Sequence, residues 1–439
     1  MKKPQFIIAA PTSNSGKTTL TLGLLRALEN RGINTQAFKV GPDYIDPKFH
    51  KVANGKSSLN LDLYMMSREE LHQQYANYSR GSQAICVEGV MGLFDGAKKD
   101  EGSTAAVAKE LDLPVVLVVN AKSVAYSVAP LLYGFKNFDK EINIAGVIFN
   151  NVNTATHYQF LKEACDDVGV TSFGYVPRVP DCEIPSRHLG LSIANMEFYD
   201  GVIQKIADAL TPNLNLDLLL KSTTIQEKEV VKETSYKKGS LQIAVAKDAS
   251  FNFSYVQNIE SLEQLGTVTF FSPLNDTQLP EADLIYFPGG YPELYTEQLA
   301  SNTSMLQSVK EYADNGGNIL AECGGMMYLG KSLIDLNGKT HNLVGVFNFT
   351  ATLEDKKLSL GYRIYKNDEL TLKGHEFHYS KLIEEDKEEH IGQFINARGK
   401  EVPTKLYKYK NVLASYMHYY LGSSEKIKSL FDIASITKS

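Results

Sequence analysis

One short stretch near the amino terminus limits the folds that are open to this chain. The run Ser15-Gly16-Lys17-Thr18-Thr19 follows the apolar residues Phe6–Ile8 and precedes a segment of helical periodicity, Leu20–Leu28. This order predicts a strand, a phosphate-binding loop and a helix. In such a loop, backbone N–H groups and the helix amino terminus face a polyphosphate, a lysine reaches its outer oxygens, and a threonine hydroxyl ligates magnesium. We therefore expect a site for ATP or GTP, with Ser15, Gly16, Lys17, Thr18 and Thr19 as its binding residues and Thr18 as a metal ligand.

The match covers only the second half of the usual phosphate-loop pattern, because Pro11 stands where the first glycine normally lies. An alternative is an ordinary loop whose serine and threonine side chains cap a helix. Lys17 and Thr18 lie in the strand-to-helix context that nucleotide binding requires, which favours the nucleotide site.

Length and composition limit the broad class of the protein. A chain of 439 residues is too long for one core and predicts two domains, or three. A hydrophobic content of 43% is typical of a globular protein, and a net charge of −6 disfavours nucleic-acid binding. The apolar runs are shorter than the roughly 20 residues that a membrane helix needs. We expect a cytoplasmic protein that binds neither nucleic acid nor a membrane.

Polar residues follow a second apolar run, Ile33–Val40. Four polar side chains lie at the end of this run or just beyond it: Lys39, Asp43, Tyr44 and Asp46. Ligands of open parallel sheets bind outside the carboxyl ends of the strands, so these side chains should face the same crevice as the phosphate loop. Lys39 could neutralise phosphoryl charge, and the aspartates could hold magnesium. Turn formation is an equal alternative, since Gly-Pro-Asp and Asp-Pro are turn signals.

Two further strand ends contribute candidates to this crevice. The apolar run Ala84–Val87 ends in Glu88, and an acidic residue in that position is typical of a magnesium ligand. Asp95 lies in the glycine-containing segment that follows. The run Ile142–Asn150 ends in Asn150, which could contact the nucleotide base.

The distribution of apolar runs predicts an α/β protein with two doubly wound parallel-sheet domains. Residues 1–210 are expected to form a phosphate-loop NTPase-like domain, because strands alternate with helix-length segments. Residues 211–240 are charged and weakly periodic, which predicts a linker. Residues 241–439 should form the second domain, starting with Leu241–Ala246.

Cys323 is the main chemical candidate in the second domain. It stands between the apolar run Asn318–Ala321 and a helical segment, and glycines follow it. This pattern is typical of a nucleophile elbow, in which a side chain is exposed on a tight turn between strand and helix. The helix amino terminus should favour a thiolate. Backbone N–H groups of Gly290 and Gly324 could stabilise an oxyanion.

A thiolate nucleophile needs a base, and the spacing leaves His378 and His418 open as candidates. A zinc site at His375 and His378 is disfavoured, because the two are three residues apart and no helical pattern surrounds them.

Eight runs together resemble one family, the cobyrinic acid a,c-diamide synthases and their relatives. They occur in the family's order over almost the whole chain. The matching runs are Ala10–Ser13 with Ser15–Thr19, Phe38–Pro47, Val87–Gly96, Arg187–Leu191, Phe287–Leu294, Ala321–Gly330, Gly374–Ser380 and Ala414–His418. The family also lacks the first glycine of the phosphate loop, which accounts for Pro11.

The resemblance implies an ATP-dependent synthetase domain fused to a class I type glutamine amidotransferase domain. It places the catalytic histidine at His418 and the catalytic cysteine at Cys323. In most class I amidotransferases a glutamate two residues after the histidine orients it. Here that position is Tyr420, so the site resembles a Cys-His dyad, with His378 or a backbone carbonyl as the orienting group.

The implied reaction is a carbon–nitrogen ligation on a tetrapyrrole. ATP would phosphorylate the a and c carboxylates of cobyrinic acid, with Lys17 and Lys39 offsetting charge and Thr18, Glu88 and Asp46 holding magnesium. Glutamine would supply ammonia, so two ATP and two glutamines are consumed per product. Residues that could contact the substrate are Asp43, Tyr44 and Asp95.

Alternatives remain for both the substrate and the class of protein. Relatives acting on hydrogenobyrinic acid or nickel sirohydrochlorin share the same motifs. In a different class, the chain would be a phosphate-loop regulatory ATPase, although such a protein has no need of Cys323. A homodimer also stays open, because the sequence does not indicate the oligomeric state.

Overall fold

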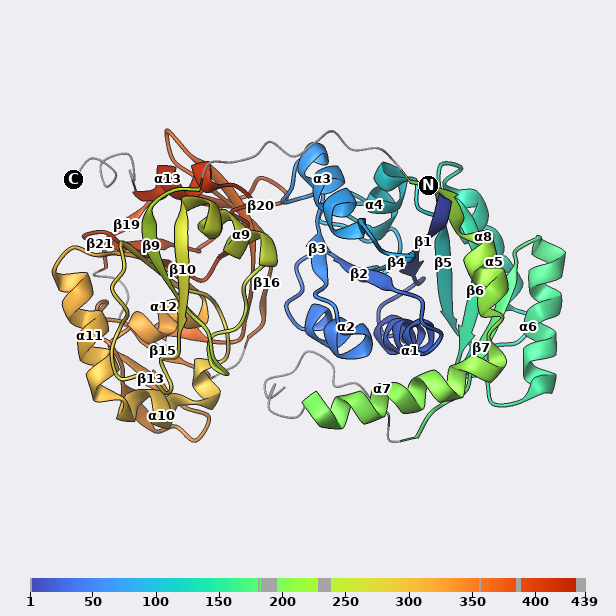
Figure 1. The fold of residues 1–439 in the computed structure, drawn as a ribbon, viewed down its shortest axis with the longest axis horizontal. Helices are drawn as coiled ribbons and strands as arrows, with labels where there is room; N and C mark the ends of the chain where they lie inside the picture. Colours follow the sequence, from blue (N-terminus) through green and yellow to red (C-terminus); the bar gives the residue numbers. More distant parts are fainter. Residues whose placement is uncertain are drawn as a thin grey trace. The chain divides into compact units, whose positions relative to one another are not determined.

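The structure is a computed structural model that describes residues 2–180, 182, 196–227, 238–354, 357–383 and 388–431. The described chain divides into two compact units, the first ending at Glu227 and the second beginning at Lys238 (Figure 1). The run Arg187–Leu191, which contributes to the family resemblance, lies outside the described residues.

The first unit alternates strands and helices, as expected for a doubly wound sheet. Its elements are β1 (Lys2–Ala9), α1 (Lys17–Asn30), β2 (Thr35–Val40), α2 (Asp46–Asn54), β3 (Leu59–Leu61), α3 (Arg68–Ser79), β4 (Ala84–Glu88), α4 (Thr104–Leu111), β5 (Val115–Asn120), α5 (Val128–Phe138), β6 (Ile144–Asn150), α6 (Ala155–Val168), β7 (Ser172–Val176), α7 (Met196–Leu210), η2 (Thr211–Asn213), α8 (Leu216–Ser222) and β8 (Thr224–Gln226). The strands from β1 to β7 are parallel neighbours in the order β3-β2-β4-β1-β5-β6-β7. This confirms the predicted parallel sheet.

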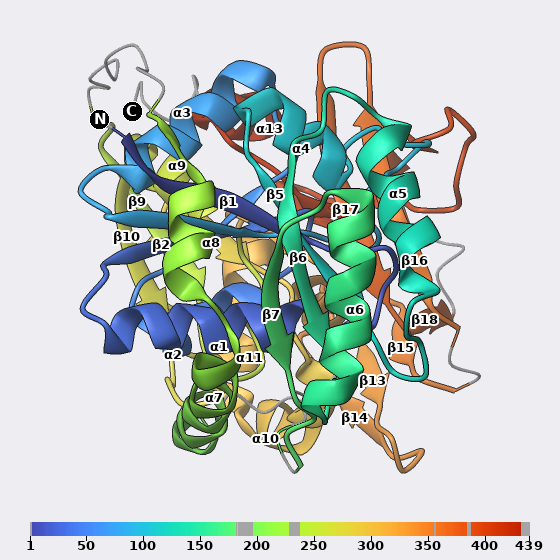
Figure 2. The same cartoon turned by 90° about the vertical axis from the view of Figure 1, so that its right-hand side faces the viewer.

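Helices cover both faces of this sheet because its central strands are apolar on both sides. In β5, Val116 and Val118 join one core with α1, α2 and α7, whereas Leu117 and Val119 join a second core with α5 and α6. Successive side chains of a strand point to opposite faces, so one buried strand supplies both cores. Figure 2 shows α1 and α7 on one side of the sheet and α5 and α6 on the other.

The expectation of a linker over residues 211–240 is wrong for its first part. Residues 211–226 form η2, α8 and β8, and β8 pairs antiparallel with β1 through Lys3 and Ile225. Leu216 and Leu219 of α8 are buried in the core to which α1 and α7 also contribute. The residues that follow this short apolar helix are highly charged, and their composition led to the prediction of a linker over the whole segment.

The second unit contains a central sheet, helices and two small sheets. Its elements are β9 (Leu241–Ala246), α9 (Val256–Leu265), β10 (Gly266–Phe271), β11 (Leu284–Phe287), η3 (Pro292–Leu294), α10 (Thr296–Ser301), α11 (Thr303–Asp314), β12 (Asn318–Glu322), α12 (Gly324–Leu329), β13 (Ser332–Ile334), β14 (Thr340–Asn342), β15 (Thr350–Thr352), β16 (Ser359–Lys366), β17 (Thr371–His378), β18 (Lys381–Ile383), β19 (His390–Ile391), β20 (Gln393–Asn396), β21 (Leu406–Tyr409), β22 (Val412–Ser415), β23 (His418–Tyr419) and α13 (Ser424–Phe431).

The central sheet of the second unit is parallel only in its larger part. Among the described residues its order is β10-β9-β11-β12-β22-β21-β19, in which β21 pairs antiparallel with β22 and β19 pairs antiparallel with β21. The expected parallel core is therefore present, but antiparallel strands extend it. One face packs on α11 and α12, and the other packs on α9, α13 and the antiparallel sheet β20-β16-β17-β23.

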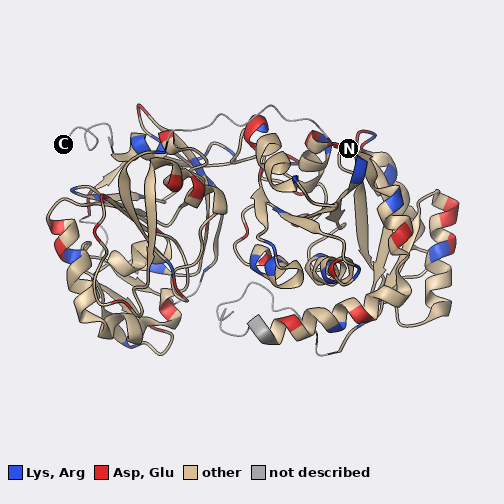
Figure 3. Ribbon diagram, in the orientation of Figure 1, with Lys and Arg blue, Asp and Glu red and all other residues tan. Residues whose placement is uncertain are grey.

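Acidic and basic residues are interspersed along the described helices of both units (Figure 3). Within the described ranges, no helix combines the length and the apolar character that crossing a lipid bilayer requires.

Candidate functional site

The phosphate loop joins β1 to α1 and has a strained backbone at two positions. Asn14 (φ 60°) and Gly16 (φ 90°) are both left-handed, and Gly16 caps the amino end of α1. A Cβ atom at Gly16 would lie 2.1 Å from Nδ2 of Asn150, which itself donates a hydrogen bond of 3.0 Å to the carbonyl of Ser15. Glycine is required here because it tolerates both the positive φ and the close approach of Asn150.

The segment after β4 packs directly against the phosphate loop. Leu93 donates its backbone N–H to the carbonyl of Ala10 at 2.8 Å, and Lys17 donates from Nζ to the carbonyl of Met91. Asp95 accepts the N–H of Gly92 at 3.0 Å. Three expected site residues, Lys17, Asp95 and Asn150, thus lie around one loop.

A cluster of buried charges lies at the carboxyl ends of β2 and β4. Nζ of Lys39 is 2.7 Å from Oδ2 of Asp46 and 2.9 Å from Oε1 of Glu88. The hydroxyl of Thr18 donates to Oε1 of Glu88 at 2.6 Å and lies 3.4 Å from Oδ2 of Asp46. The structure therefore brings together all three expected magnesium ligands and the lysine expected beside them.

His50 of α2 joins this cluster, and the sequence reasoning missed it. Its Nε2 lies 2.7 Å from Oε2 of Glu88, and its Nδ1 lies 2.9 Å from Oγ of Ser58. Burial alone raises the pKa of Glu88, but the charge of Lys39 and the hydrogen bonds from His50 and Thr18 outweigh burial and hold that pKa well below its usual range. Glu88 is consequently ionised at neutral pH.

The loop between β2 and α2 is ordered by Asp43. Its Oδ1 accepts the backbone N–H groups of Ile45 and Asp46, at 2.9 and 3.0 Å. Burial lowers the pKa of nearby Lys48 to about 7, while the charge of Asp43 opposes that shift. Asp43 therefore acts first as a turn residue, which is the alternative that the turn signals predicted, and Tyr44 follows it in the same loop.

These residues fit a magnesium nucleotide. Two carboxylates and a hydroxyl converge where the phosphate loop ends, and carboxylate and hydroxyl oxygens are ligands that magnesium accepts. Within the described ranges no group of three or more His, Cys, Asp or Glu side chains is arranged to hold a metal ion. A nucleotide-bound magnesium needs fewer protein ligands, because phosphate oxygens and water complete its shell.

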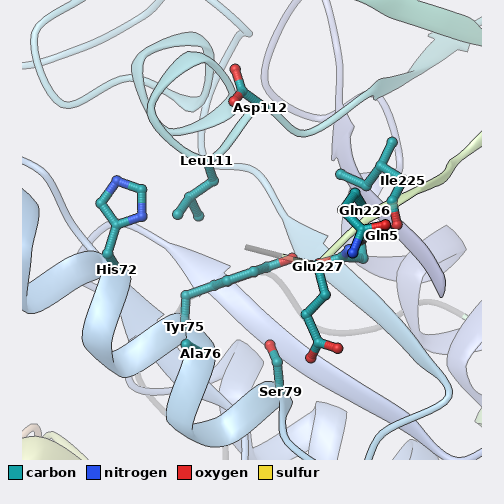
Figure 4. A pocket seen from close by; sticks show the side chains of 10 residues that line it. All are labelled: Gln5, His72, Tyr75, Ala76, Ser79, Leu111, Asp112, Ile225, Gln226 and Glu227. Carbon is teal, nitrogen blue, oxygen red and sulfur yellow. Dashed lines mark hydrogen bonds between the residues drawn. The ribbon is translucent and has the colours of Figure 1, made fainter. Parts of the chain in front are cut away.

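A separate cavity of about 410 Å³ lies at the other end of the first sheet (Figure 4). Its lining includes Gln5 of β1, Tyr75 and Ser79 of α3, Ile225 of β8, and Glu227, which directly follows β8. Gln5 lies four residues before Ala9, which is the carboxyl end of β1, and the phosphate loop begins after Ala9. The cavity contains none of the expected site residues and lies at the amino ends of the strands, where open parallel sheets do not bind their ligands.

In the second unit, Cys323 lies on a sharp turn between β12 and α12. Its φ of 45° and ψ of −103° lie outside the regions that non-glycine residues favour, as expected for a nucleophile elbow. Its backbone N–H donates to the carbonyl of Ser415 at 2.7 Å. A Cβ atom at Gly325 would lie 2.4 Å from the carbonyl oxygen of Phe287, so the turn can approach β11 only because glycine follows it.

The expectation that the helix amino terminus favours a thiolate at Cys323 is wrong in this structure. Burial, the largest effect, raises the pKa of the thiol far above its usual value, and Glu293 adds to the rise. The N–H of Gly324 lowers that pKa only in part. The physical reason is that Cys323 is 5% exposed, so desolvation of an anion outweighs the dipole of a six-residue helix. Ionisation of Cys323 therefore needs a base.

Gly290 and Gly324, the expected oxyanion residues, lie beside each other. A Cβ atom at Gly324 would lie 3.0 Å from both the nitrogen and the oxygen of Gly290. Gly289 packs beneath His418, since a Cβ atom there would lie 2.2 Å from Cε1 of the imidazole. The two glycines that follow β11 thus touch both the cysteine turn and the histidine.

His418 of β23 is 1% exposed and is enclosed by aromatic and ionisable groups. Its ring stacks on that of His375, with 5.1 Å between centroids and 17° between planes. His378, which was proposed to orient it, instead stacks on Tyr416 at 3.7 Å, and Nδ1 of His378 lies 2.8 Å from the carbonyl of Ser380. His378 affects His418 only electrostatically.

A carboxyl group that the sequence reasoning missed faces His418. Oε2 of Glu322 lies 3.8 Å from Nδ1 of the imidazole. Burial raises the pKa of Glu322 to about 8, and burial together with His378 lowers the pKa of His418 to about 3. One signal could have identified it: Glu322 is an acidic residue at the end of an apolar buried strand, as Glu88 is in the first unit.

Comparisons with known proteins match both units. Residues 6–191 match the family model of the CobQ/CobB/MinD/ParA nucleotide binding domain, and residues 242–426 match that of the CobB/CobQ-like glutamine amidotransferase domain. A solved structure described as "Crystal structure of glutamine amidotransferase" matches 44% of this chain and 98% of its own, at 15% identity and a TM-score of 0.33.

Curated relatives match nearly the full length. A protein of Picrophilus torridus named "Cobyrinate a,c-diamide synthase" is 40% identical, with 98% of each chain covered. A protein of the same name from Caldanaerobacter subterraneus subsp. tengcongensis is 39% identical, with 97% of each covered. A protein of Brucella anthropi named "Hydrogenobyrinate a,c-diamide synthase" is 38% identical, covering 94% of this chain and 97% of its own.

Proposed function

Because this chain belongs to the cobyrinate a,c-diamide synthase family, we propose that it is a glutamine-hydrolysing ligase. It converts the a and c carboxylates of cobyrinic acid to amides, in cobalamin biosynthesis in the cytoplasm, and uses ATP and glutamine. The observation that carries this proposal is that one chain holds two separate clusters of buried polar and ionisable side chains. One is the Lys39, Asp46 and Glu88 cluster beside a phosphate loop, and the other is a strained cysteine turn beside a buried histidine.

The first centre activates the carboxylate. A carboxylate does not react with ammonia at neutral pH, because its oxygen is a poor leaving group and its charge repels nucleophiles. Transfer of the terminal phosphoryl group of ATP to a substrate carboxylate oxygen forms an acyl phosphate and releases ADP. Lys17 and Lys39 stabilise the negative charge of the transferring group. Magnesium, held by Thr18, Asp46 and Glu88, neutralises phosphate charge when bound.

The backbone of the phosphate loop positions the nucleotide. Ser15, Gly16 and Thr19 present N–H groups at the amino end of α1, where the helix dipole favours anions. Asn150 supports this loop through its bond to the carbonyl of Ser15. Asp43, Tyr44 and Asp95 lie in loops beside the loop–helix junction, and we assign them to substrate contact.

The second centre releases ammonia from glutamine. Sγ of Cys323 attacks the side-chain carbonyl carbon and forms a thioester, while the amide nitrogen leaves with a proton from His418. Water then hydrolyses the thioester to glutamate. Backbone N–H groups of Gly290 and Gly324 stabilise the oxyanion of each tetrahedral intermediate. Because burial raises the pKa of the Cys323 thiol, a base has to accept its proton, and we assign that step to His418.

One experiment tests the substrate assignment. Purified protein is incubated with ATP, glutamine and one tetrapyrrole at a time: cobyrinic acid, hydrogenobyrinic acid or nickel sirohydrochlorin. Mass spectrometry then counts the carboxylates converted to amides. We expect two conversions on cobyrinic acid. Two conversions on hydrogenobyrinic acid alone would favour the second candidate, which the name of the Brucella anthropi relative supports. ATP hydrolysis without any amidated product would contradict the proposal.

A further inference from the structure

Glu322 is a fully buried carboxyl group held in one orientation. Tyr286 donates its hydroxyl to Oε2 at 2.9 Å, and Tyr419 donates its backbone N–H to Oε1 at 3.1 Å. The exposed fraction of Glu322 is 0%. Burying a carboxyl group this completely is costly unless the group is hydrogen-bonded or has a function. Two donors from two different strands fix its position.

The strand register brings this carboxyl group to the histidine. Glu322 is paired with Ser415 across β12 and β22, and the N–H of Cys323 donates to the same Ser415. His418 follows three residues later. Oε2 of the carboxyl group lies 3.8 Å from Nδ1 of His418, so the proton exchange assigned to this histidine falls to its other ring nitrogen, Nε2.

The position where most class I amidotransferases carry their glutamate cannot supply this carboxylate, because it is Tyr420. The Tyr420 ring packs edge-on against Tyr255 with 6.0 Å between centroids, and its backbone N–H donates to the carbonyl of Lys373. A carboxyl group on β12, a strand of the central sheet, lies 3.8 Å from the imidazole instead.

We propose that Glu322 is a positioning residue for glutamine hydrolysis, which holds the His418 imidazole with Nε2 toward the thiol and stabilises its protonated form. This inference rests on the proposed glutaminase function. The proton moves from Sγ of Cys323 to Nε2 of His418, and Glu322 neither gains nor loses an atom in that step. Opposite charges attract strongly at this separation in a buried site, so ionised Glu322 favours the imidazolium.

Other ionisable groups surround the pair and enter its pH dependence. Three ionisable groups lie around Glu322: Tyr286 of β11, Tyr419 of β23 and the Cys323 thiol. Two histidines of β17 face His418, namely His375 and His378. Further from the pair, Glu293 and Glu376 act on Cys323. Since burial raises the pKa of Glu322 to about 8, its carboxylate form increases as pH approaches that value.

The test compares Glu322→Gln with wild type in two assays: release of glutamate from glutamine, and amidation driven by added ammonia. The amide keeps the size of the side chain but cannot become an anion. We expect kcat for glutamine hydrolysis to fall about 100-fold or more, because a mispositioned or destabilised imidazolium has effects of this size. KM for glutamine should stay within about twofold. Wild-type glutamine hydrolysis should become faster as pH rises toward 8, because Glu322 ionises there, and Glu322→Gln should not show this increase. Amidation with ammonia should be the same in both proteins.

Two further variants control the experiment. Glu260→Gln is the matched substitution, since Glu260 also has a pKa raised by burial, to about 7, but lies on α9. It should leave kcat and the pH profile unchanged. Tyr286→Phe keeps the carboxylate and removes one donor to it, so the wild-type rise should move to higher pH.

A wild-type kcat and pH profile in Glu322→Gln would overturn the proposal. If that variant does not fold, an unshifted profile in Tyr286→Phe would overturn it. Failure of the proposed function would look different, because wild type would then produce no amidated tetrapyrrole with ammonia or glutamine.

Discussion

The hydroxyl of Thr18 donates a hydrogen bond of 2.6 Å to Oε1 of Glu88, although 70 residues separate them along the chain. Thr18 lies in the first turn of α1, directly after the phosphate loop, and Glu88 ends strand β4. Lys39 and Asp46 complete the group. The three expected magnesium ligands are therefore already assembled around a lysine ammonium, which offsets their negative charge.

Replacing Glu88 with glutamine should weaken the magnesium dependence of ATP turnover. The amide cannot supply an anionic ligand, so we expect the magnesium concentration for half-maximal activity to rise about tenfold or more, equivalent to about 1.4 kcal/mol. The measurement is ATP hydrolysis against magnesium concentration, with glutaminase activity as the internal control. An unchanged magnesium response would remove Glu88 from the set of ligands.

Replacing Lys17 with alanine should abolish most ATP turnover. The side chain supplies a positive charge to the transferring phosphoryl group, and loss of one such group costs about 100-fold or more in rate. Glutamine hydrolysis should remain measurable, because Lys17 belongs to the first unit. Equal loss of both activities would argue against two separate centres.

Replacing Cys323 with alanine or serine should separate the two nitrogen sources. Glutamine-dependent amidation should fall to background, since no thioester can form, while amidation with added ammonia continues at the wild-type rate. The assay follows amidated tetrapyrrole with each nitrogen source in parallel. Loss of the ammonia-dependent reaction as well would contradict the division of labour proposed here.

Adding one methyl group at Gly289 should impair glutamine hydrolysis without affecting the synthetase reaction. The new Cβ atom would lie 2.2 Å from Cε1 of His418, so the imidazole must move. A displacement of about 1 Å can cost about 100-fold in rate. Gly201→Ala is a suitable control, because nothing lies within 4 Å of its Cβ position. An equally active Gly289→Ala variant would show that the position of His418 is not critical.

Stability should depend on pH through Glu322. Its pKa is raised from 4.5 to about 8 in the folded protein, so the folded state keeps a proton that the unfolded state releases. The stabilising contribution is complete below about pH 4.5 and is lost as pH rises through about 8. Wild type should therefore lose more stability than Glu322→Gln between about pH 5 and about pH 8.

Thermal unfolding of both proteins at several pH values measures this effect. We expect the difference between their Tm values to change by about 4 °C or more, since about 2–4 °C corresponds to each kcal/mol in a domain of this size. A constant difference across the pH range would show that the pKa of Glu322 is not raised.

The amino-acid sequence by itself determined the α/β class, the position of the phosphate loop and the turn that carries Cys323. These features depend on local patterns: apolar runs that alternate with helical periodicity, and glycines at positions of positive φ or close approach. It also marked Lys39, Asp46 and Glu88 as candidates, because the carboxyl ends of parallel strands share one edge of a sheet.

Only the tertiary structure decided how distant residues meet. It showed that residues 211–226 pack onto the first sheet, that burial raises the pKa of the Cys323 thiol, and that Glu322 faces His418. Strand register and solvent exposure cause these outcomes, and both depend on contacts between segments far apart in the chain. A periodic pattern reports which face of an element is buried, but not which partner it meets there.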